Sequence, residues 1–552
     1  MNHLSGLDAT FLHFETAEMP MHVGSLNVLD LPEGYNGDFY EDAKAYMVAR
    51  MHLADVFTRK LALMPFDLSN PVWVEDEDID VDYHVRHVTL PKPGTNRQLQ
   101  QYVARLHSTL MDRSRPLWEF FIIDGLQSGQ VALYTKVHHA GIDGQAGVEV
   151  GKAIFDTAPT GRVIKPPRLR ARSHNYQLGM AELATAALRN TAAQYVKLYK
   201  MLPALGRALG SLAKPTEPVP GSDGKALAKR FDMRAPRTPF NVSITNQRSF
   251  AGRTISLAET KAIGKHFGVT LNDVVMATVS GALRKYLKDS NELPDKSLVA
   301  GVPVSLREAG DTSANNQASM ILVSLASNLK DPIERLRAIN ASSAASKSTM
   351  NKFKAVILDD FPMFGAPWLM SGAASMIGRS GLVNVLPPVA NVAISNVQGA
   401  PFPMYFAGAL VTCYYPVSIA SHGTALNVTV QSYNGRMDYG LIACRRAVPD
   451  ITEIGDYMLV EHQTLMDLMQ TVPGDAKSAA GAARAAASRT VAPQPPAAAA
   501  PAVVVAKVRK PVASKAVAGK TPARKAVAKK VTPARTAAPT APAKRARKAA
   551  AV

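Results

Sequence analysis

The segment TKVHHAGIDGQAG, residues 135–147, holds the side chains best suited to chemistry. It places His138 beside His139 and follows them with Asp143 and Gly144. An imidazole exchanges protons near neutral pH, so a histidine here could act as a general base toward a hydroxyl group. Asp143 could orient a histidine ring or close the loop through an ion pair, and Gly144 permits a close backbone approach. The segment is therefore our candidate catalytic centre.

A pair of adjacent histidines also has structural and metal-binding uses. Zinc would need further ligands, and no third histidine, cysteine or carboxylate arrives at ligand spacing on a neighbouring predicted helix. Cys413 and Cys444 are the only cysteines; they lack metal-ligand spacing and cannot form a disulfide framework. We predict no metal and no cofactor, and a reducing, cytoplasmic setting. A structural pair and a general base both stay open at this point.

The two histidines directly follow the second strand of a predicted hairpin. WEFFIIDG (118–125) and VALYTKV (131–137) are apolar runs on either side of the turn LQSGQ. Adjacent side chains on a strand point to opposite faces, so only one histidine can face a given cleft. The irregular alternation of VALYTKV does not choose between them. We expect a helix to begin just after Gly144, and another over Arg97–Met111 with an apolar face.

A second folded unit is predicted to begin near Phe240. Ser256 and Glu259 form a capping box for a helix ending near Gly268, and Thr270 begins the next helix. Asn434 and Gly435 are typical of a tight turn between two strands. In the first of these strands Leu426, Val428 and Val430 alternate with Asn427, Thr429 and Gln431.

Strands and helices mix in both halves without a strict βαβ rhythm, which indicates an α/β fold of two α+β-like layered domains. The expected divisions are residues 1–160, a partly helical crossover at 161–239, a second domain at 240–474, and a tail at 475–552.

The charge of the chain is concentrated in that tail. Residues 476–552 contain 17 lysines and arginines and no acidic residue, whereas the remaining chain has 46 basic and 44 acidic side chains. The tail is rich in alanine, proline and valine and has no aromatic residue. It cannot bury enough apolar surface to fold, so we expect disorder. A polycation of this kind adheres to anionic phospholipid or nucleic acid without reading a sequence.

Neither a signal peptide nor a membrane span is predicted. The opening MNHLSGLDATFLHFE lacks a basic start followed by an apolar run. The uncharged stretch Phe361–Gly378 is short for a span and contains two prolines and three glycines. It is read as a kinked core helix, with a membrane-surface contact or an acyl tunnel as the alternatives.

The pattern HHAGIDG at 138–144 is similar to the HHxxxDG signature of CoA-dependent acyltransferases, which include chloramphenicol acetyltransferase and nonribosomal condensation domains. Other segments resemble the bacterial wax ester synthase/acyl-CoA:diacylglycerol acyltransferases. They are LSGLDATFLHFETAEMPMHVGSL (4–26), PLW (116–118), NDVV (272–275), PVSLR (303–307), SNVQG (395–399) and LNVTVQSYNGRMDYGLIA (426–443). The resemblance runs in order from residue 1 to about 470 and leaves the tail outside.

This resemblance implies two chloramphenicol-acetyltransferase-like domains and a fatty acyl transfer from acyl-CoA to diacylglycerol or a fatty alcohol, without an acyl-enzyme. It implies His139 as the base, with His138 supporting it. Asp143 resembles the family aspartate that holds the loop through an arginine, for which Arg307 is the candidate. Asn272 is either an oxyanion donor or a helix cap. Pro116, Leu117, Trp118, Asp273, Ser395 and Asn396 are expected to be structural.

Two departures and two alternatives accompany this interpretation. The family commonly shows SNVPGP and a GLGL-type stretch, where this chain has SNVQGAP and SHGTALN. A condensation-type enzyme shares HHxxxDG, but it would lack the PLW and NDVV context. A protein that tethers DNA or lipid granules through its tail is the other alternative. The expected location is cytoplasmic, in peripheral contact with the inner membrane or lipid inclusions.

Overall fold

The computed structural model describes residues 2–4, 6–62, 71–142, 144–166, 235–305, 318–353 and 380–474. All of them belong to one compact unit, residues 1–489. Asp143, Arg307, the stretch 361–378, most of the predicted crossover and the basic tail lie outside the described residues.

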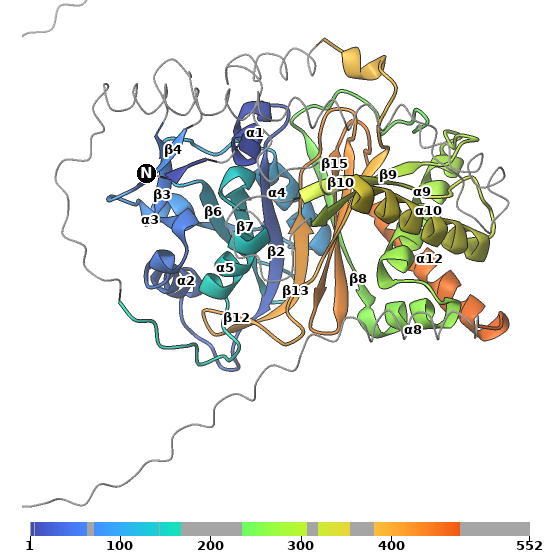
Figure 1. Ribbon diagram of the computed structural model, residues 1–552. Helices are drawn as coiled ribbons and strands as arrows, with labels where there is room; N and C mark the ends of the chain where they lie inside the picture. The colour runs from blue at the N-terminus through green and yellow to red at the C-terminus, as the bar shows by residue number, and fades with distance from the viewer. Residues whose placement is uncertain are drawn as a thin grey trace, which may run out of the picture. The chain divides into compact units, whose positions relative to one another are not determined.

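The first six-stranded sheet contains the predicted hairpin at its centre (Figure 1). Its order is β12 (Tyr405–Phe406), β13 (Ala409–Val417), β2 (His22–Asp30), β7 (Val131–His138), β6 (Trp118–Asp124) and β5 (Val85–Thr89). β6 and β7 pair antiparallel, which confirms the hairpin. β12 and β13 come from the second half of the chain, so the first sheet is completed by residues about 270 positions beyond β7.

The second six-stranded sheet is built only from the second half. Its order is β10 (Ala318–Ser324), β9 (Val299–Ser305), β11 (Val392–Val397), β14 (Leu426–Tyr433), β15 (Arg436–Cys444) and β8 (Arg248–Ser256). A small third sheet contains β1 (Asn2–His3), β4 (Val72–Glu75) and β3 (Arg59–Ala62). The turn between β14 and β15 has Asn434 and Gly435 at φ of 41° and 79°, as the sequence predicts for a two-residue hairpin.

Helices cover the sheets in layers. The described helices are α1 (Gly6–Phe14), α2 (Phe39–Val48), α3 (Val81–His84), α4 (Asn96–His107), α5 (Gly144–Ile154), α8 (Leu257–Phe267), α9 (Leu271–Asp289), α10 (Pro332–Phe353) and α12 (Ile451–Thr471). Short 3₁₀ turns are η1 (Met51–Leu53), η2 (Asp55–Phe57), η4 (His139–Gly141) and η5 (Leu382–Asn384). The mixed α/β class with layered sheets and helices is confirmed.

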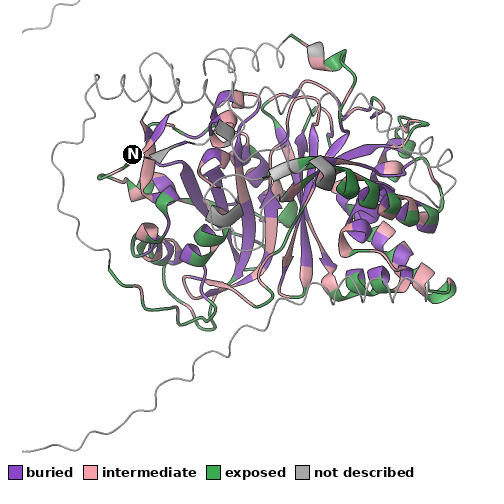
Figure 2. Cartoon of the chain, viewed as in Figure 1, coloured by how far each residue is buried: buried purple, intermediate pink, exposed green. Residues whose placement is uncertain are grey.

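Three hydrophobic cores correspond to these layers. One joins the first sheet to α2 and α5, and a second packs α4 between that sheet and strands β8 and β15. The largest core joins the second sheet to α8, α9, α10 and α12. In Figure 2 the strands of both large sheets are mostly buried, whereas the outward faces of the helices are exposed. Burying apolar faces between layers is what stabilises such a fold.

Local signals set the ends of several helices. Thr95 and Gln98 form a full capping box at the start of α4, and Thr270 with Asp273 does the same for α9. α4 ends at His107, so Leu110 lies beyond the helix, where it is exposed. At α8 only the serine half of the predicted box forms, because Glu259 instead pairs with His462, 3.1 Å away.

Strand β14 differs from the predicted alternation because both of its faces are covered. Leu426, Val428 and Val430 enter the core as expected. Asn427 and Thr429 are buried as well, and they satisfy their polar groups locally: Thr429 donates to the Asn427 Oδ1 atom at 2.9 Å. The hydrogen bonds allow polar side chains to remain in the interior at little cost.

The crossing of β13 over β15 depends on a glycine. A side-chain carbon on Gly440 would lie 1.6 Å from the Pro416 carbonyl oxygen. Asp438, two residues earlier, is fully buried and accepts hydrogen bonds from the Tyr414 N–H and the Thr254 hydroxyl, both at 2.7 Å. These contacts hold β13 against the second sheet while it completes the first.

We therefore expect Gly440→Ala to lower the free energy of unfolding by about 2 kcal/mol or more, because a methyl group would force two strands apart. Thermal or urea unfolding measures this change. Gly151→Ala in α5 is the matched control, since nothing lies within 4 Å of the added carbon and alanine favours a helix. Equal stability of the two variants would contradict the prediction.

Candidate active site

The two histidines occupy different environments at the end of β7. His138 is the last residue of the strand, faces His22 of β2 in the register, and is fully buried. His139 begins the 3₁₀ turn η4 and remains partly exposed. The structure thus separates the pair: His138 is fully buried, whereas His139 is partly exposed although its Nδ1 atom is buried.

Both ring nitrogens of His138 face groups of the protein. The Ala140 N–H donates to Nδ1 at 3.1 Å, so Nδ1 is an acceptor and the ring proton is on Nε2. Nε2 lies 3.3 Å from the Glu15 carboxylate. Taking up a proton at Nδ1 would break the bond to Ala140, so His138 is unsuited to act as a base. Its ring instead holds the turn on which His139 stands.

His139 is held by its backbone and its ring. Its N–H donates to the Met21 carbonyl at 2.9 Å. Its ring stacks on Phe11 of α1, with centroids 3.9 Å apart and planes 15° from parallel. A stacked neighbour restricts the orientation of the ring. The N-terminal segment therefore contacts the turn on two sides.

Glu15 is the charged centre of this arrangement. Its carboxylate accepts two bonds from the Arg113 guanidinium, at 2.7 and 3.1 Å, and one from the Met21 N–H at 3.0 Å. Burial raises its pKa, but His138, Arg113 and the Met21 N–H outweigh burial and lower the pKa to about 2. Glu15 is therefore ionised at neutral pH, and its negative charge is balanced by Arg113.

The PLW segment supports the same turn from the side of β6. The Leu117 carbonyl accepts from the His138 N–H at 3.0 Å. Trp118 is fully buried, donates its ring N–H to the Phe57 carbonyl at 3.2 Å, and stacks on His84. Pro116 is buried before them. Leu117 and Trp118 pack the strand end, whereas Pro116 also borders a pocket of about 400 Å³.

In the second half, the NDVV and SNVQG segments lie together. The Asn396 amide of β11 is 3.5 Å from the Asn272 amide oxygen at the start of α9. Helix capping is done by Thr270 and Asp273, so the cap interpretation of Asn272 is wrong. Asp273 is buried and also accepts from Asn340 of α10 at 2.7 Å. Ser395 lies next to Asn396 on β11.

No hydrogen bond in the described ranges joins Asn272 to His138 or His139. The predicted helix forms as α5, but it begins at Gly144 itself, so this glycine is the first helical residue and not a loop residue. Asp143 and Arg307 are outside the described residues, so their ion pair stays a prediction.

Within the described part of the chain, no three histidine, cysteine or carboxylate side chains converge on a possible metal position. Nor does any described helix have the length and apolar character to cross a bilayer.

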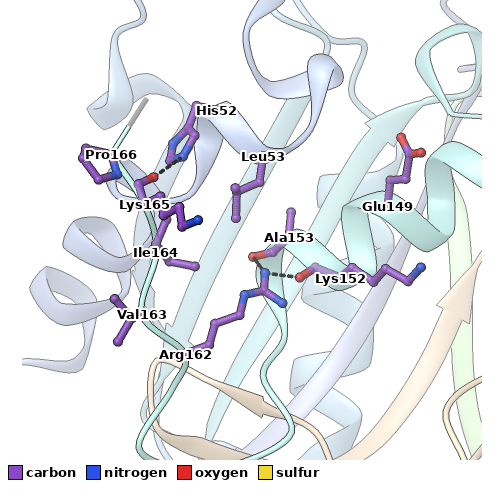
Figure 3. Close-up of a pocket in the computed structure, with 10 residues that line it drawn as sticks. All are labelled: His52, Leu53, Glu149, Lys152, Ala153, Arg162, Val163, Ile164, Lys165 and Pro166. Carbon is purple, nitrogen blue, oxygen red and sulfur yellow. Dashed lines mark hydrogen bonds between the residues drawn. The ribbon is translucent and has the colours of Figure 1, made fainter. Parts of the chain in front are cut away.

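A separate open pocket of about 780 Å³ lies along α5 and η1 (Figure 3). Its charged lining residues include Lys152, Lys165 and Glu149, and Arg162 is turned back to the Lys152 and Ala153 carbonyls that end α5. None of the lining residues belongs to the motifs described above. We therefore assign the candidate site to the surroundings of His139 and not to this pocket.

The residues that sequence reasoning missed are Phe11, Glu15, Met21 and Arg113. They belong to two stretches about 100 positions apart, and no spacing rule relates them to the histidines. The only signal was the family-like character of the N-terminal segment, which carried no residue roles.

Comparisons with known proteins identify the family of this chain. The family model for the wax ester synthase/diacylglycerol acyltransferase catalytic domain matches residues 4–275, and the model for the C-terminal domain of the same family matches residues 314–465. A putative diacylglycerol O-acyltransferase of Mycobacterium tuberculosis is 36% identical over 454 residues, covering 82% of this chain and 96% of the relative.

Two further proteins are similar over most of the chain. The O-acyltransferase WSD of Acinetobacter baylyi is 33% identical over 469 residues, covering 84% of this chain and 96% of the relative. The solved wax ester synthase/diacylglycerol acyltransferase of Marinobacter aquaeolei VT8 is 31% identical, with a TM-score of 0.60. It covers 85% of this chain, and all of the solved chain is matched.

The lowered pKa of Glu15 predicts an acid-sensitive contribution to stability. Because the pKa is below its ordinary value, the carboxylate stabilises the fold at pH above about 4.5, and this stabilisation is lost as the pH falls toward about 2. Compared with Glu15→Gln, the wild type should lose on the order of 3 kcal/mol over that range. Urea unfolding at several pH values measures the difference. A difference that does not change with pH would contradict the prediction.

Proposed function

Because this chain belongs to the wax ester synthase/diacylglycerol acyltransferase family, we propose that His139 is the base with which it transfers a fatty acyl group from coenzyme A to an alcohol. The enzyme is an acyl-CoA-dependent O-acyltransferase that acts on diacylglycerol, a long-chain alcohol or both. The single observation that supports His139 is the contrast in the pair: His138 is buried with its Nδ1 occupied, and His139 is not buried.

The proposed reaction needs one base and two substrates. The His139 imidazole takes the proton from the acceptor hydroxyl, and the oxygen attacks the thioester carbonyl carbon. A tetrahedral intermediate forms with the negative charge on the former carbonyl oxygen. As it collapses, the C–S bond breaks, the ester is released, and the CoA sulfur takes the proton from His139. No acyl-enzyme and no cofactor enter this scheme.

Asn272 remains the candidate for stabilising the developing oxyanion. Thr270 and Asp273 cap the helix, so the Asn272 side chain is not needed as the cap. Asn272 lies near the surface, with its amide beside that of Asn396. An amide N–H donated to the oxyanion is worth most where water is excluded. Asp143 is proposed to hold the motif loop through Arg307, as in the family pattern.

The first test follows CoA release from palmitoyl-CoA with either hexadecanol or dipalmitoylglycerol as acceptor. His139→Ala should lower kcat by about 10²- to 10⁴-fold, which is the usual contribution of general-base help. An active His139→Ala enzyme would overturn the mechanism. No CoA release from the wild type with either acceptor would overturn the proposed acceptor classes.

The matched control is His52→Ala. His52 is also a histidine with an exposed edge, but its Nε2–H donates to the Lys165 carbonyl at 3.0 Å, and it lies at the separate pocket. Its replacement should leave kcat unchanged. A similar loss in both variants would show that histidine replacement lowers activity without reference to the motif.

Peripheral attachment through the basic tail is proposed as a second property. Residues 476–552 contain 17 basic and no acidic side chains, and each lysine or arginine near an anionic bilayer contributes about 1 kcal/mol. The same charge would attract nucleic acid without sequence preference. The enzyme would then act at the inner membrane or at lipid inclusions, where its substrates collect.

Deleting residues 476–552 tests this property. Sedimentation with vesicles containing anionic phospholipid should fall at least about tenfold at low salt, whereas turnover in detergent should stay unchanged. The full chain with neutral vesicles is the control. Undiminished vesicle binding, or loss of turnover in detergent, would contradict the assignment of attachment to the tail.

A further inference from the structure

We propose that Glu15, held by Arg113, is a positioning residue that fixes the place of His139 in the acyl transfer. The inference rests on the proposed role of His139 as the base. Glu15 touches neither the ring of His139 nor, in this proposal, the substrate. It acts through two short series of contacts, one through Met21 and one through His138. Both end at η4, the turn that contains His139.

The first route runs through the backbone of Met21. The Glu15 Oε1 atom accepts the Met21 N–H at 3.0 Å, and the Met21 carbonyl accepts the His139 N–H at 2.9 Å. Met21 also directly precedes β2, the strand that pairs with β7. The position of the His139 backbone is therefore tied to the carboxylate by two consecutive hydrogen bonds.

The second route runs through the ring of His138. The same Oε1 atom lies 3.3 Å from Nε2, and Nδ1 accepts the Ala140 N–H at 3.1 Å. A carboxylate beside Nε2 requires the proton to be there, and that leaves Nδ1 as the acceptor that Ala140 needs. Fixing one nitrogen by a carboxylate sets the role of the other. Glu15 thus selects the tautomer that holds the turn closed.

The carboxylate is itself immobilised. Its other oxygen, Oε2, accepts both bonds from Arg113, whose guanidinium also donates to the Leu12 carbonyl at 2.8 Å. Only 3% of the Glu15 side chain is exposed. With Arg113 on Oε2 and the Met21 N–H on Oε1, both oxygens of the carboxylate are held. The same N-terminal segment also supplies Phe11, which stacks on the ring of His139.

Catalysis is sensitive to this kind of support, because a displacement of about 1 Å in a reacting group can cost about 10²-fold in rate. The Glu15 Oε1 atom contacts both the Met21 N–H and the His138 ring, and each of these groups is bonded to the turn that contains His139. The geometry therefore predicts that replacing Glu15 lowers kcat, because His139 is no longer held in place.

The experiment compares Glu15→Ala, Glu15→Gln and Glu75→Gln in the full chain, with palmitoyl-CoA and hexadecanol. Glu15→Ala should lower kcat about 10²-fold, with KM for palmitoyl-CoA changed less than about twofold. Glu15→Gln keeps one acceptor oxygen and should recover part of the loss. Glu75 pairs with Arg59 on the surface, and its replacement should leave kcat unchanged.

A double variant separates positioning from general stabilisation. If Glu15 acts through the base, adding Glu15→Ala to His139→Ala should not lower the residual rate further. Each rate is divided by the folded fraction measured by circular dichroism. If Glu15→Ala does not fold, Glu15→Gln takes its place under the same criteria.

Three results would overturn the inference: an unchanged kcat in a folded Glu15 variant, a loss that appears only in KM, or an additive loss in the double variant. Failure of the proposed function looks different. In that case His139→Ala keeps its kcat, whatever the Glu15 variants do. If His139→Ala is inactive and the Glu15 variants are fully active, only the positioning role fails.

Discussion

The hydrogen bond from the Ala140 N–H to the Nδ1 atom of His138 is the interaction on which the candidate site depends. It uses the nitrogen that a base would need, closes the turn after β7, and leaves His139 as the accessible histidine. Two adjacent residues of the same type thus lie in different environments. The remaining contacts near the site serve to keep that turn in place.

Those contacts come from distant parts of the chain. The N-terminal segment supplies Glu15 and Phe11, and the residue just before β6 supplies the Leu117 carbonyl. β7 itself lies at the centre of a sheet whose far strands, β12 and β13, belong to the second half. β13 also packs against β15, so this strand belongs to the first sheet and contacts the second.

The second half brings its own polar groups toward one place. Asn272 begins α9 and Asn396 lies on β11, and their amides are close although 124 positions separate them. Asp273 belongs to the adjoining frame, since it is buried between Thr270 and Asn340. Here, as with His138 and His139, one of two neighbouring residues is buried and the other is more accessible.

Much of this protein was determined by local sequence. The hairpin before the histidines, the capping of α9 by Thr270, the Asn434–Gly435 turn and the mixed α/β class all follow from patterns within a few residues, because hydrogen bonds and turn geometry act at that range. The motif residues also identified the enzyme class through their resemblance to a family. The tertiary structure alone decided which histidine is accessible, that Asn272 is not the cap, and that Glu15 and Arg113 support the turn. Those outcomes depend on contacts between residues that are far apart in the sequence. No local pattern or periodicity along the chain predicts such contacts.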